Sequence, residues 1–285
     1  MKSGIILCTA IIAWALSACS NSSNLESDAK RLDSLLLSDT IKEQFQEFVH
    51  IFPSQIKVGR LFKNAGLKFQ AAELVPAAGV EKLVSPGDKA LAMGFYGVDM
   101  VYASLHNQTQ IVMTNLRLTK KLSEDLGLES VYAEKDYIRK FEANINNQDT
   151  LESIIRDLFA ETDAFLQDNK KLDLYILSFA GGWTESVYLA ANFAYATKNK
   201  GVVQLIGEQL ISLDPLIELF RESKLESKDK ELLKELEAIR SAIRAGIVKE
   251  ETDTEPMLIE MDDEKLKNLI ATLQVVRNRV IQPKP

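Results

Sequence analysis

The sequence contains only two cysteines, Cys8 and Cys19, and only two histidines, His50 and His106, among its 285 residues. Two cysteines cannot form a disulfide framework or a cysteine-based zinc site, and two histidines leave little material for a histidine-ligated metal centre. Basic residues are not in excess either, because 34 Lys and Arg stand against 41 Asp and Glu, for a net charge of −7. Nucleic-acid binding depends on clustered Lys and Arg, so this balance argues against a nucleic-acid partner.

The amino terminus lacks an apolar run long enough to cross a membrane. The apolar stretch 4–16 has 13 residues, whereas a membrane-spanning helix needs about 20. The stretch follows the single positive charge of Lys2 and ends in small residues, an order of features that is typical of a secretory signal. We therefore predict that residues 1–18 are a signal peptide.

The residues Leu16-Ser17-Ala18-Cys19 resemble the lipobox of bacterial lipoproteins. The resemblance implies cleavage after Ala18, a diacylglyceryl group on the Cys19 thiol and an acylated new amino terminus, palmitate being a typical acyl group. Two or three acyl chains anchor a protein in a membrane almost permanently, where a single chain does not. Ser20 stands where an inner-membrane retention signal often places Asp, and no dense acidic run follows. By this analogy we expect the outer membrane, on its periplasmic face.

Beyond a polar tether over residues 19–38, the dominant hydrophobic period is helical. The sequence predicts one all-α domain over residues 39–285, with short connections. One predicted helix begins after an N-cap at Ser85 and extends past Asn107, and another has an N-cap at Asp149 and a capping-box partner at Glu152. A central buried helix is predicted over 172–198, and amphipathic helices over 230–247 and 264–281. A short extended piece is predicted over 257–261.

A faint internal repeat relates residues 89–104 to residues 175–190 at an offset of 86. The two segments share four positions, which are Leu91/Leu177, Asp99/Glu185, Val101/Val187 and Tyr102/Tyr188. Two copies are fewer than a solenoid needs. The repeat therefore predicts two pseudo-repeated helical units that face each other about a local twofold axis, and chance similarity between two buried helices is the alternative.

Several stretches together resemble a family of Bacteroidota lipoproteins of unknown function. The stretches are 52–54 leading into a helix that ends at 65–66, Lys89-Ala90-Leu91 with Gly94-Phe95-Tyr96-Gly97-Val98-Asp99, Gln108-Thr109-Gln110, 121–127, and Ala180-Gly181-Gly182-Trp183 with Glu185 and Tyr188. They cover roughly residues 50–200. The resemblance implies an all-α lipoprotein and transfers no activity, cofactor or partner.

The repeat also selects the residues that could form a site. Tyr96, Asp99 and His106 recur at helical spacing on one stripe, and the second copy brings Trp183 and Glu185 to the equivalent place. If the copies face each other, the two acids approach, and paired carboxylates can bind a divalent cation, bind a small ligand or perform acid–base chemistry. The alternative is structural: the acids accept hydrogen bonds inside the core while the glycines permit close helix packing.

These observations favour a lipid-anchored, non-enzymatic binding or scaffold module of the cell envelope, with a protein partner, a membrane contact through Cys19 and no cofactor. One alternative is a lipoprotein that binds a small ligand or a divalent cation. Another is a hydrolase that uses Asp99 and Glu185. A third, a helical metal-uptake lipoprotein loosely similar to imelysin-type proteins, is disfavoured by the shortage of histidine.

Overall fold

The computed structural model describes the part of the chain that carries most of the predicted helices. The described residues are 59–60, 63–133, 135–145, 147–168, 171–223, 229–250, 252 and 257–283. They lie in the compact unit Gln44–Pro285. The predicted signal peptide, Cys19 and the tether lie outside them. Over these residues the chain is helical apart from one two-stranded sheet, so the all-α prediction is confirmed. None of their helices combines the length and the apolarity needed to span a membrane.

The elements of this part follow one another with short connections. In chain order they are the 3-10 helices η1 (Ala71–Glu73) and η2 (Ala77–Lys82), then α3 (Pro86–Leu105), α4 (Thr109–Asp125), α5 (Glu129–Ala133), α6 (Tyr137–Ala143), α7 (Gln148–Asp168), α8 (Leu172–Thr197), α9 (Lys200–Glu208), α10 (Leu210–Glu222), α11 (Asp229–Arg244), β1 (Ile247–Lys249), β2 (Leu258–Ile259) and α12 (Asp263–Ile281).

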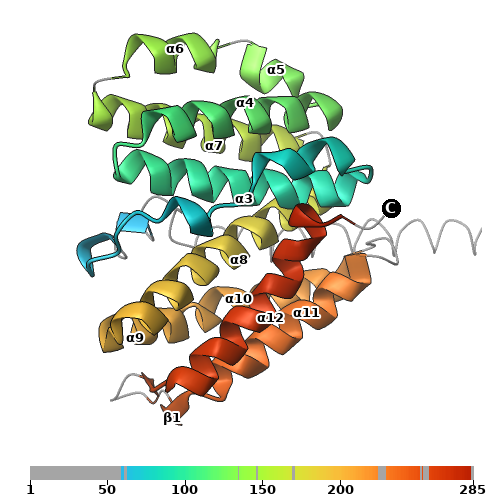
Figure 1. The fold of residues 1–285 in the computed structure, drawn as a ribbon. Helices are drawn as coiled ribbons and strands as arrows, with labels where there is room; N and C mark the ends of the chain where they lie inside the picture. The colour runs from blue at the N-terminus through green and yellow to red at the C-terminus, as the bar shows by residue number, and fades with distance from the viewer. Residues whose placement is uncertain are drawn as a thin grey trace, which may run out of the picture. The chain divides into compact units, whose positions relative to one another are not determined.

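The two longest apolar helices, α3 and α8, lie at the centre and pack against each other. Helices α4 and α7 cover α3 on one side, and α12 packs on α8 with α11 and α10 beyond it (Figure 1). Helix α3 is buried along almost its whole circumference from Ala90 to Leu105. Neighbouring segments therefore cover all sides of α3, including the side that carries Tyr96 and Asp99.

Two glycines allow α3 and α8 to approach until their backbones touch. A Cβ atom added to Gly94 would stand 1.9 Å from the Ser178 carbonyl oxygen, and one added to Gly181 would stand 2.1 Å from the Leu91 carbonyl oxygen. The contact is reciprocal, since Gly94 and Gly181 are separated by the same 87 residues as Leu91 and Ser178. This offset differs by one residue from the repeat in the sequence. The local geometry fits the predicted pair of facing helices, which diverge toward their C-terminal ends (Figure 1).

The predicted N-terminal end of α3 is confirmed, and the predicted C-terminal end is wrong. Ser85 is the N-cap as predicted, since its hydroxyl accepts a hydrogen bond from the Asp88 N–H at 3.0 Å. The helix does not extend past Asn107, because Leu105 is its last residue and Asn107 has a φ of 59°. That left-handed conformation, which Asn tolerates better than most residues, turns the chain into α4.

The predicted cap of α7 is two residues too late. The side chain of Asn147, and not of Asp149, accepts the hydrogen bond from the Thr150 N–H at 3.1 Å, and α7 begins at Gln148. Glu152 does not close a capping box. Its carboxylate instead pairs with Arg60 and accepts a hydrogen bond from the Gln148 side-chain amide. Asn147 and Asp149 stand two residues apart and both are good capping residues, which explains the error.

The helix predicted over 230–247 ends earlier, at Arg244, because the chain then enters a small antiparallel sheet. The Gly246 carbonyl accepts a hydrogen bond from the Glu260 N–H at 2.8 Å, and Ile247 pairs with Ile259. The predicted extended piece over 257–261 is confirmed by β2. The side-chain amide of Gln204 holds β2 in place, since it donates to the Met257 carbonyl at 2.8 Å and accepts from the Ile259 N–H at 3.3 Å.

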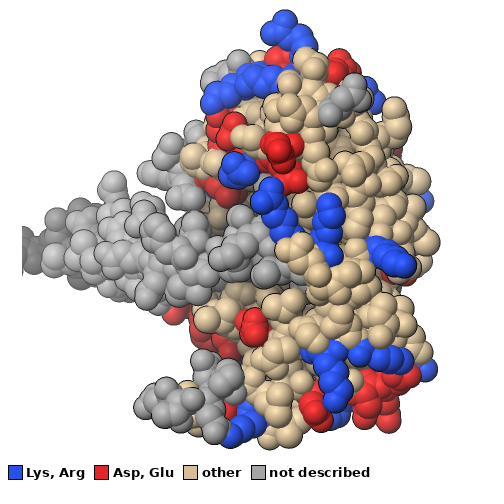
Figure 2. Space-filling view, turned by 90° about the vertical axis from the view of Figure 1, so that its left-hand side faces the viewer, with Lys and Arg blue, Asp and Glu red and all other residues tan. Residues whose placement is uncertain are grey.

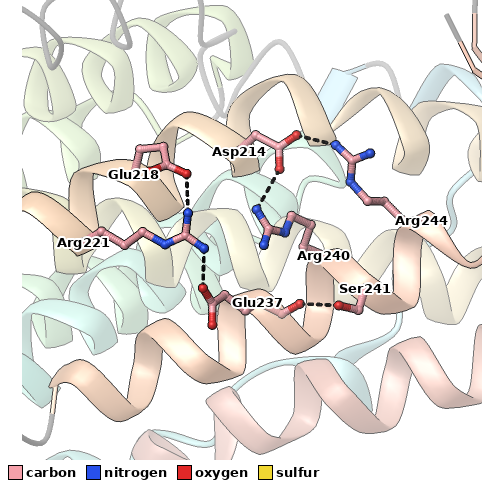
Figure 3. Close-up of polar contacts among 7 residues, drawn as sticks. All are labelled: Asp214, Glu218, Arg221, Glu237, Arg240, Ser241 and Arg244. Atoms are coloured by element: carbon pink, nitrogen blue, oxygen red, sulfur yellow. Dashed lines mark hydrogen bonds and ion pairs between the residues drawn. The ribbon is translucent and has the colours of Figure 1, made fainter.

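Ion pairs join the outer helices α10 and α11 (Figure 3). Asp214 on α10 pairs with Arg244 at 2.8 Å and with Arg240 at 3.6 Å, and Arg221 on α10 pairs with Glu237 at 2.5 Å. All of these side chains are at least a quarter exposed. Solvent screens such pairs, so each contributes about 1 kcal/mol at most, and the apolar contacts hold the helices together.

Candidate functional site

The structure places Asp99 of α3 and Glu185 of α8 side by side in the core, as the repeat predicted. Both side chains are fully buried. Each perturbs the pKa of the other, through its charge or through a hydrogen bond between the two carboxyl groups. The glycine contact explains why they meet, because it brings the two helices close one turn earlier on each chain segment. The acids therefore form a pair.

Arg277 of α12 completes the cluster, and sequence reasoning missed it. Its Nε and Nη2 donate to the two carboxylate oxygens of Glu185 at 2.7 and 3.1 Å. Its Nη2 also donates to the Glu73 carbonyl at 2.6 Å, and the guanidinium lies 3.7 Å from the centre of the Tyr188 ring. The Arg277 side chain is only 3% exposed. Burial alone would lower the pKa of Arg277, but the charge of Glu185 and the bidentate hydrogen bond raise it instead.

A visible signal could have found Arg277. The buried residues of α12 include Leu266, Leu269, Leu273 and Val280, at the spacing of one apolar helix face. Arg277 stands four residues after Leu273 and three before Val280, so it occupies a position on that face. A charged residue on an apolar face is almost never fully buried without a partner. The sequence therefore indicates that Arg277 needs a partner, but it does not identify Glu185, which lies 92 residues away in the chain, as that partner.

Asp99 differs from Glu185 because it has no cationic partner of its own. Its Oδ2 accepts a hydrogen bond from the Val75 N–H at 2.9 Å, whereas its Oδ1 has no donor among the described residues. Burial, and then the negative charge of Glu185, raise the pKa of Asp99 well above its usual range. A proton on Oδ1 satisfies both atoms, since a neutral carboxyl group donates one hydrogen bond and the Glu185 carboxylate beside it accepts one. The cluster then holds one negative and one positive charge.

The other predicted site residues do not all join this cluster. Tyr96 lies beside it and donates a hydrogen bond from its hydroxyl to the Pro76 carbonyl at 3.0 Å. Burial, followed by the charges of Asp99 and Glu185, raises the pKa of Tyr96. Trp183 faces another way, and its indole N–H donates to the Ser212 hydroxyl at 3.0 Å.

His106 is the C-cap of α3 and stands seven residues after Asp99. Its ring packs on Tyr102, with the ring centres 4.9 Å apart, and on Phe69 at 5.9 Å. Burial and then the nearby charge of Lys63 lower the pKa of His106, so the imidazole is neutral at pH 7. The contacts of His106 are thus with Phe69, Tyr102 and Lys63, and it is not a member of the acid cluster.

The acid cluster is separate from three surface hollows. Their volumes are about 310, 1000 and 630 Å³, and none of the three is lined by Asp99, Glu185 or Arg277. No group of three or more His, Cys, Asp and Glu side chains with metal-binding geometry occurs among the described residues. Acidic and basic side chains are interspersed over the described part of the face in Figure 2. In the described cluster the charge of Glu185 is paired with Arg277, and only Asp99 Oδ1 is left without a donor.

Comparisons of the chain with protein-family models, with curated proteins and with solved structures find no match in any of the three. The resemblance to Bacteroidota lipoproteins therefore stays a prediction. Conclusions about function depend on the sequence and on the geometry of the site.

Proposed function

We propose that the protein is a lipid-anchored, non-enzymatic module of the cell envelope that binds another protein. The membrane anchor is the lipid on Cys19. The helical part carries the binding surface, and its buried acid cluster serves to fix α3, α8 and α12 in one arrangement.

One observation supports this proposal over the alternatives: the charge of Glu185 is matched by Arg277 inside the core. A carboxylate pair that binds a cation or acts on a substrate needs an unmatched charge and a path to solvent. Here Glu185 accepts two hydrogen bonds from Arg277, and Asp99, whose pKa is raised by burial and by the charge of Glu185, accepts one from the Val75 N–H. This arrangement favours a structural role for both acids and disfavours both a cation site and a hydrolase centred on them.

The anchor is tested by Cys19→Ala in cells grown with a labelled fatty acid. We expect the wild type to incorporate label and the variant to lose it and to accumulate as an uncleaved precursor. Cys8→Ala is the matched control, because Cys8 lies within the predicted signal peptide and should not affect labelling of the mature chain. Equal labelling of the wild type and Cys19→Ala would rule out Cys19 as the anchor.

The binding function is tested by a photo-crosslinking amino acid placed at one exposed apolar position at a time in the full chain. Leu258, Val275 and Ile211 are 46%, 51% and 64% exposed and lie on β2, α12 and α10. A partner that docks on one face should give a discrete adduct from one or two of these positions, and the adduct should be lost with Cys19→Ala. No adduct at any position, or the same adducts at all three, would contradict a specific binding surface.

A further inference from the structure

The smallest of the three hollows, about 310 Å³, lies where α3 ends and where α4 and α7 begin. These three helix ends are on the left in Figure 1, which is the side that Figure 2 shows. None of the described residues that line the hollow has a charged side chain. It is lined by the polar residues Ser104, Asn107, Gln108, Thr109 and Gln148 and by the aliphatic residues Val112, Ile145 and Leu151. One part of the wall is thus rich in hydroxyl and amide groups, and another part is aliphatic.

Two long helices begin at this hollow. Thr109 is the first residue of α4 and Gln148 is the first residue of α7, and both line it. The first N–H groups of a helix have no acceptor inside the helix, and the aligned peptide dipoles place about half a positive charge there. At α4 no side chain offsets this charge, because Gln108 forms no cap and donates its amide to the His106 carbonyl at 3.1 Å instead.

An unpartnered hydroxyl also lines the hollow. Ser104 is 4% exposed, and its Oγ has no hydrogen-bond partner among the described residues. A buried polar atom without a partner carries a substantial free-energy cost, so such atoms are rare, and a water molecule or a ligand that accepts the hydrogen bond removes the cost. The hydroxyl can donate one hydrogen bond to an acceptor in the hollow.

Acidic side chains nearby do not cancel this preference for an acceptor. Glu152, one turn after Gln148, is paired with Arg60, so its charge is matched. Asp149, in the first turn of α7, is exposed to solvent, where its charge is screened.

From these features we infer that the hollow binds a short aliphatic monocarboxylate. The carboxylate accepts hydrogen bonds from the Ser104 hydroxyl and from the free N–H groups at the start of α4, and the alkyl chain contacts Val112, Ile145 and Leu151. A hollow of about 310 Å³ is at the small end of ligand pockets, so the ligand has few carbon atoms. This site is distinct from the acid cluster and does not depend on the proposed partner binding.

The test is calorimetric titration of the full lipidated chain in detergent with butyrate, with neutral butyramide and with inorganic phosphate. We expect saturable binding of butyrate with a Kd on the order of 1 mM, and binding of butyramide at least about tenfold weaker, because the helix ends favour a negative charge. Ser104→Ala should weaken butyrate binding at least about tenfold, since it removes a hydrogen bond to a charged group. The melting temperature of Ser104→Ala should not fall, because the lost hydroxyl has no partner in the free protein and its burial carries a cost.

A second variant and two matched controls keep the result independent of folding. Ile145 is 37% exposed, so Ile145→Asp should fold and should weaken butyrate binding by charge repulsion. Ile211→Asp and Ser241→Ala make the same changes on α10 and α11 and should bind butyrate like the wild type. The inference is overturned if the wild type binds no butyrate, if Ser104→Ala or Ile145→Asp binds it undiminished, if butyramide binds equally well, or if phosphate binds more tightly than butyrate.

Discussion

Asp99→Asn and Glu185→Gln each remove one carboxyl group from the same buried cluster, yet we expect opposite effects on stability. Burial and the charge of Glu185 raise the pKa of Asp99 in the folded protein, so we expect it to keep its proton to a higher pH than in the unfolded chain. Asn has the same shape as a neutral Asp. Its amide can donate to Glu185 from the position of Oδ1 while its oxygen accepts from the Val75 N–H. Asp99→Asn should therefore preserve both hydrogen bonds.

The pH dependence follows from the protons bound in each state. Asp99 in the unfolded chain loses its proton near pH 4, whereas in the folded protein it retains the proton to a higher pH. Above pH 4 the folded state thus binds more protons than the unfolded state. The free energy of unfolding then falls as pH rises, by up to about 1.4 kcal/mol per pH unit, until the raised pKa is passed. Asn does not titrate, so this position contributes no pH slope to the free energy of unfolding of Asp99→Asn. The variant should therefore become progressively more stable than the wild type between pH 4 and pH 7.

Glu185→Gln should instead destabilise the protein. The variant leaves the Arg277 guanidinium, 3% exposed, without its bidentate partner. Removing one member of a buried ion pair costs about 3–5 kcal/mol, because the other charge stays buried. Some of this loss is recovered if Asp99 ionises in its place. The double variant, which has no carboxyl group left, should therefore lose more stability than the sum of the two single changes.

A matched control isolates the effect of burial. Glu235 pairs with Arg279 at the same two distances, 2.7 and 3.1 Å, but the two side chains are 20% and 15% exposed. Glu235→Gln should cost about 1 kcal/mol or less. The assay is urea unfolding of each variant at pH 4.5, 6 and 7. A wild type and Asp99→Asn with the same pH slope would show that Asp99 is ionised in the folded protein. Equal losses for Glu185→Gln and Glu235→Gln would refute the role of burial.

Three further predictions concern packing and cooperativity. Gly94→Ala should destabilise the protein by about 3 kcal/mol or more, because the new methyl group meets the rigid backbone of α8; Gly201→Ala, whose Cβ would only contact the Asn199 side chain at 3.2 Å, is the control, and equal melting temperatures would contradict the contact. Trp183→Phe should cost about 1–3 kcal/mol by leaving the buried hydroxyl of its partner Ser212 without this donor, and an unchanged urea midpoint would contradict that hydrogen bond. A chain that begins at Ser20 should give a helical circular-dichroism spectrum and one melting transition, whereas two separate transitions would contradict a single cooperative domain.

Local rules acting on adjacent residues predicted most of the helical elements correctly. The Ser85 cap, the buried helix over 172–198 and the short strand near 257–261 are all confirmed, because each depends on capping chemistry or on hydrophobic spacing within a few residues. Two errors concern helix ends, one where two nearby residues could both serve as the N-cap and one where the backbone of a single residue ends the helix. Asn147 caps α7 in place of Asp149, and Asn107 ends α3 through a positive φ that no hydrophobic pattern records.

The candidate site was half predictable. The repeat placed Asp99 and Glu185 at equivalent positions on two apolar helices, and the glycines indicated close packing, so their meeting followed from the sequence. The sequence alone did not determine whether the pair was an open site or a closed cluster. That outcome depended on Arg277, on the Val75 N–H and on the Glu73 carbonyl, which come from distant segments.

Sequence by itself determined the helical class, the charge balance and the predicted lipid anchor, because each is a property of composition or of a few consecutive residues. Only the tertiary structure decided which charges meet and which polar atoms stay without a partner. Burial makes the difference: the same carboxylate that is weakly coupled in water becomes strongly coupled to every charge nearby once α3, α8 and α12 exclude solvent. The pKa of Asp99 is raised, and the Ser104 hydroxyl lacks a partner, because of what surrounds these residues in space and not because of what precedes them in the chain.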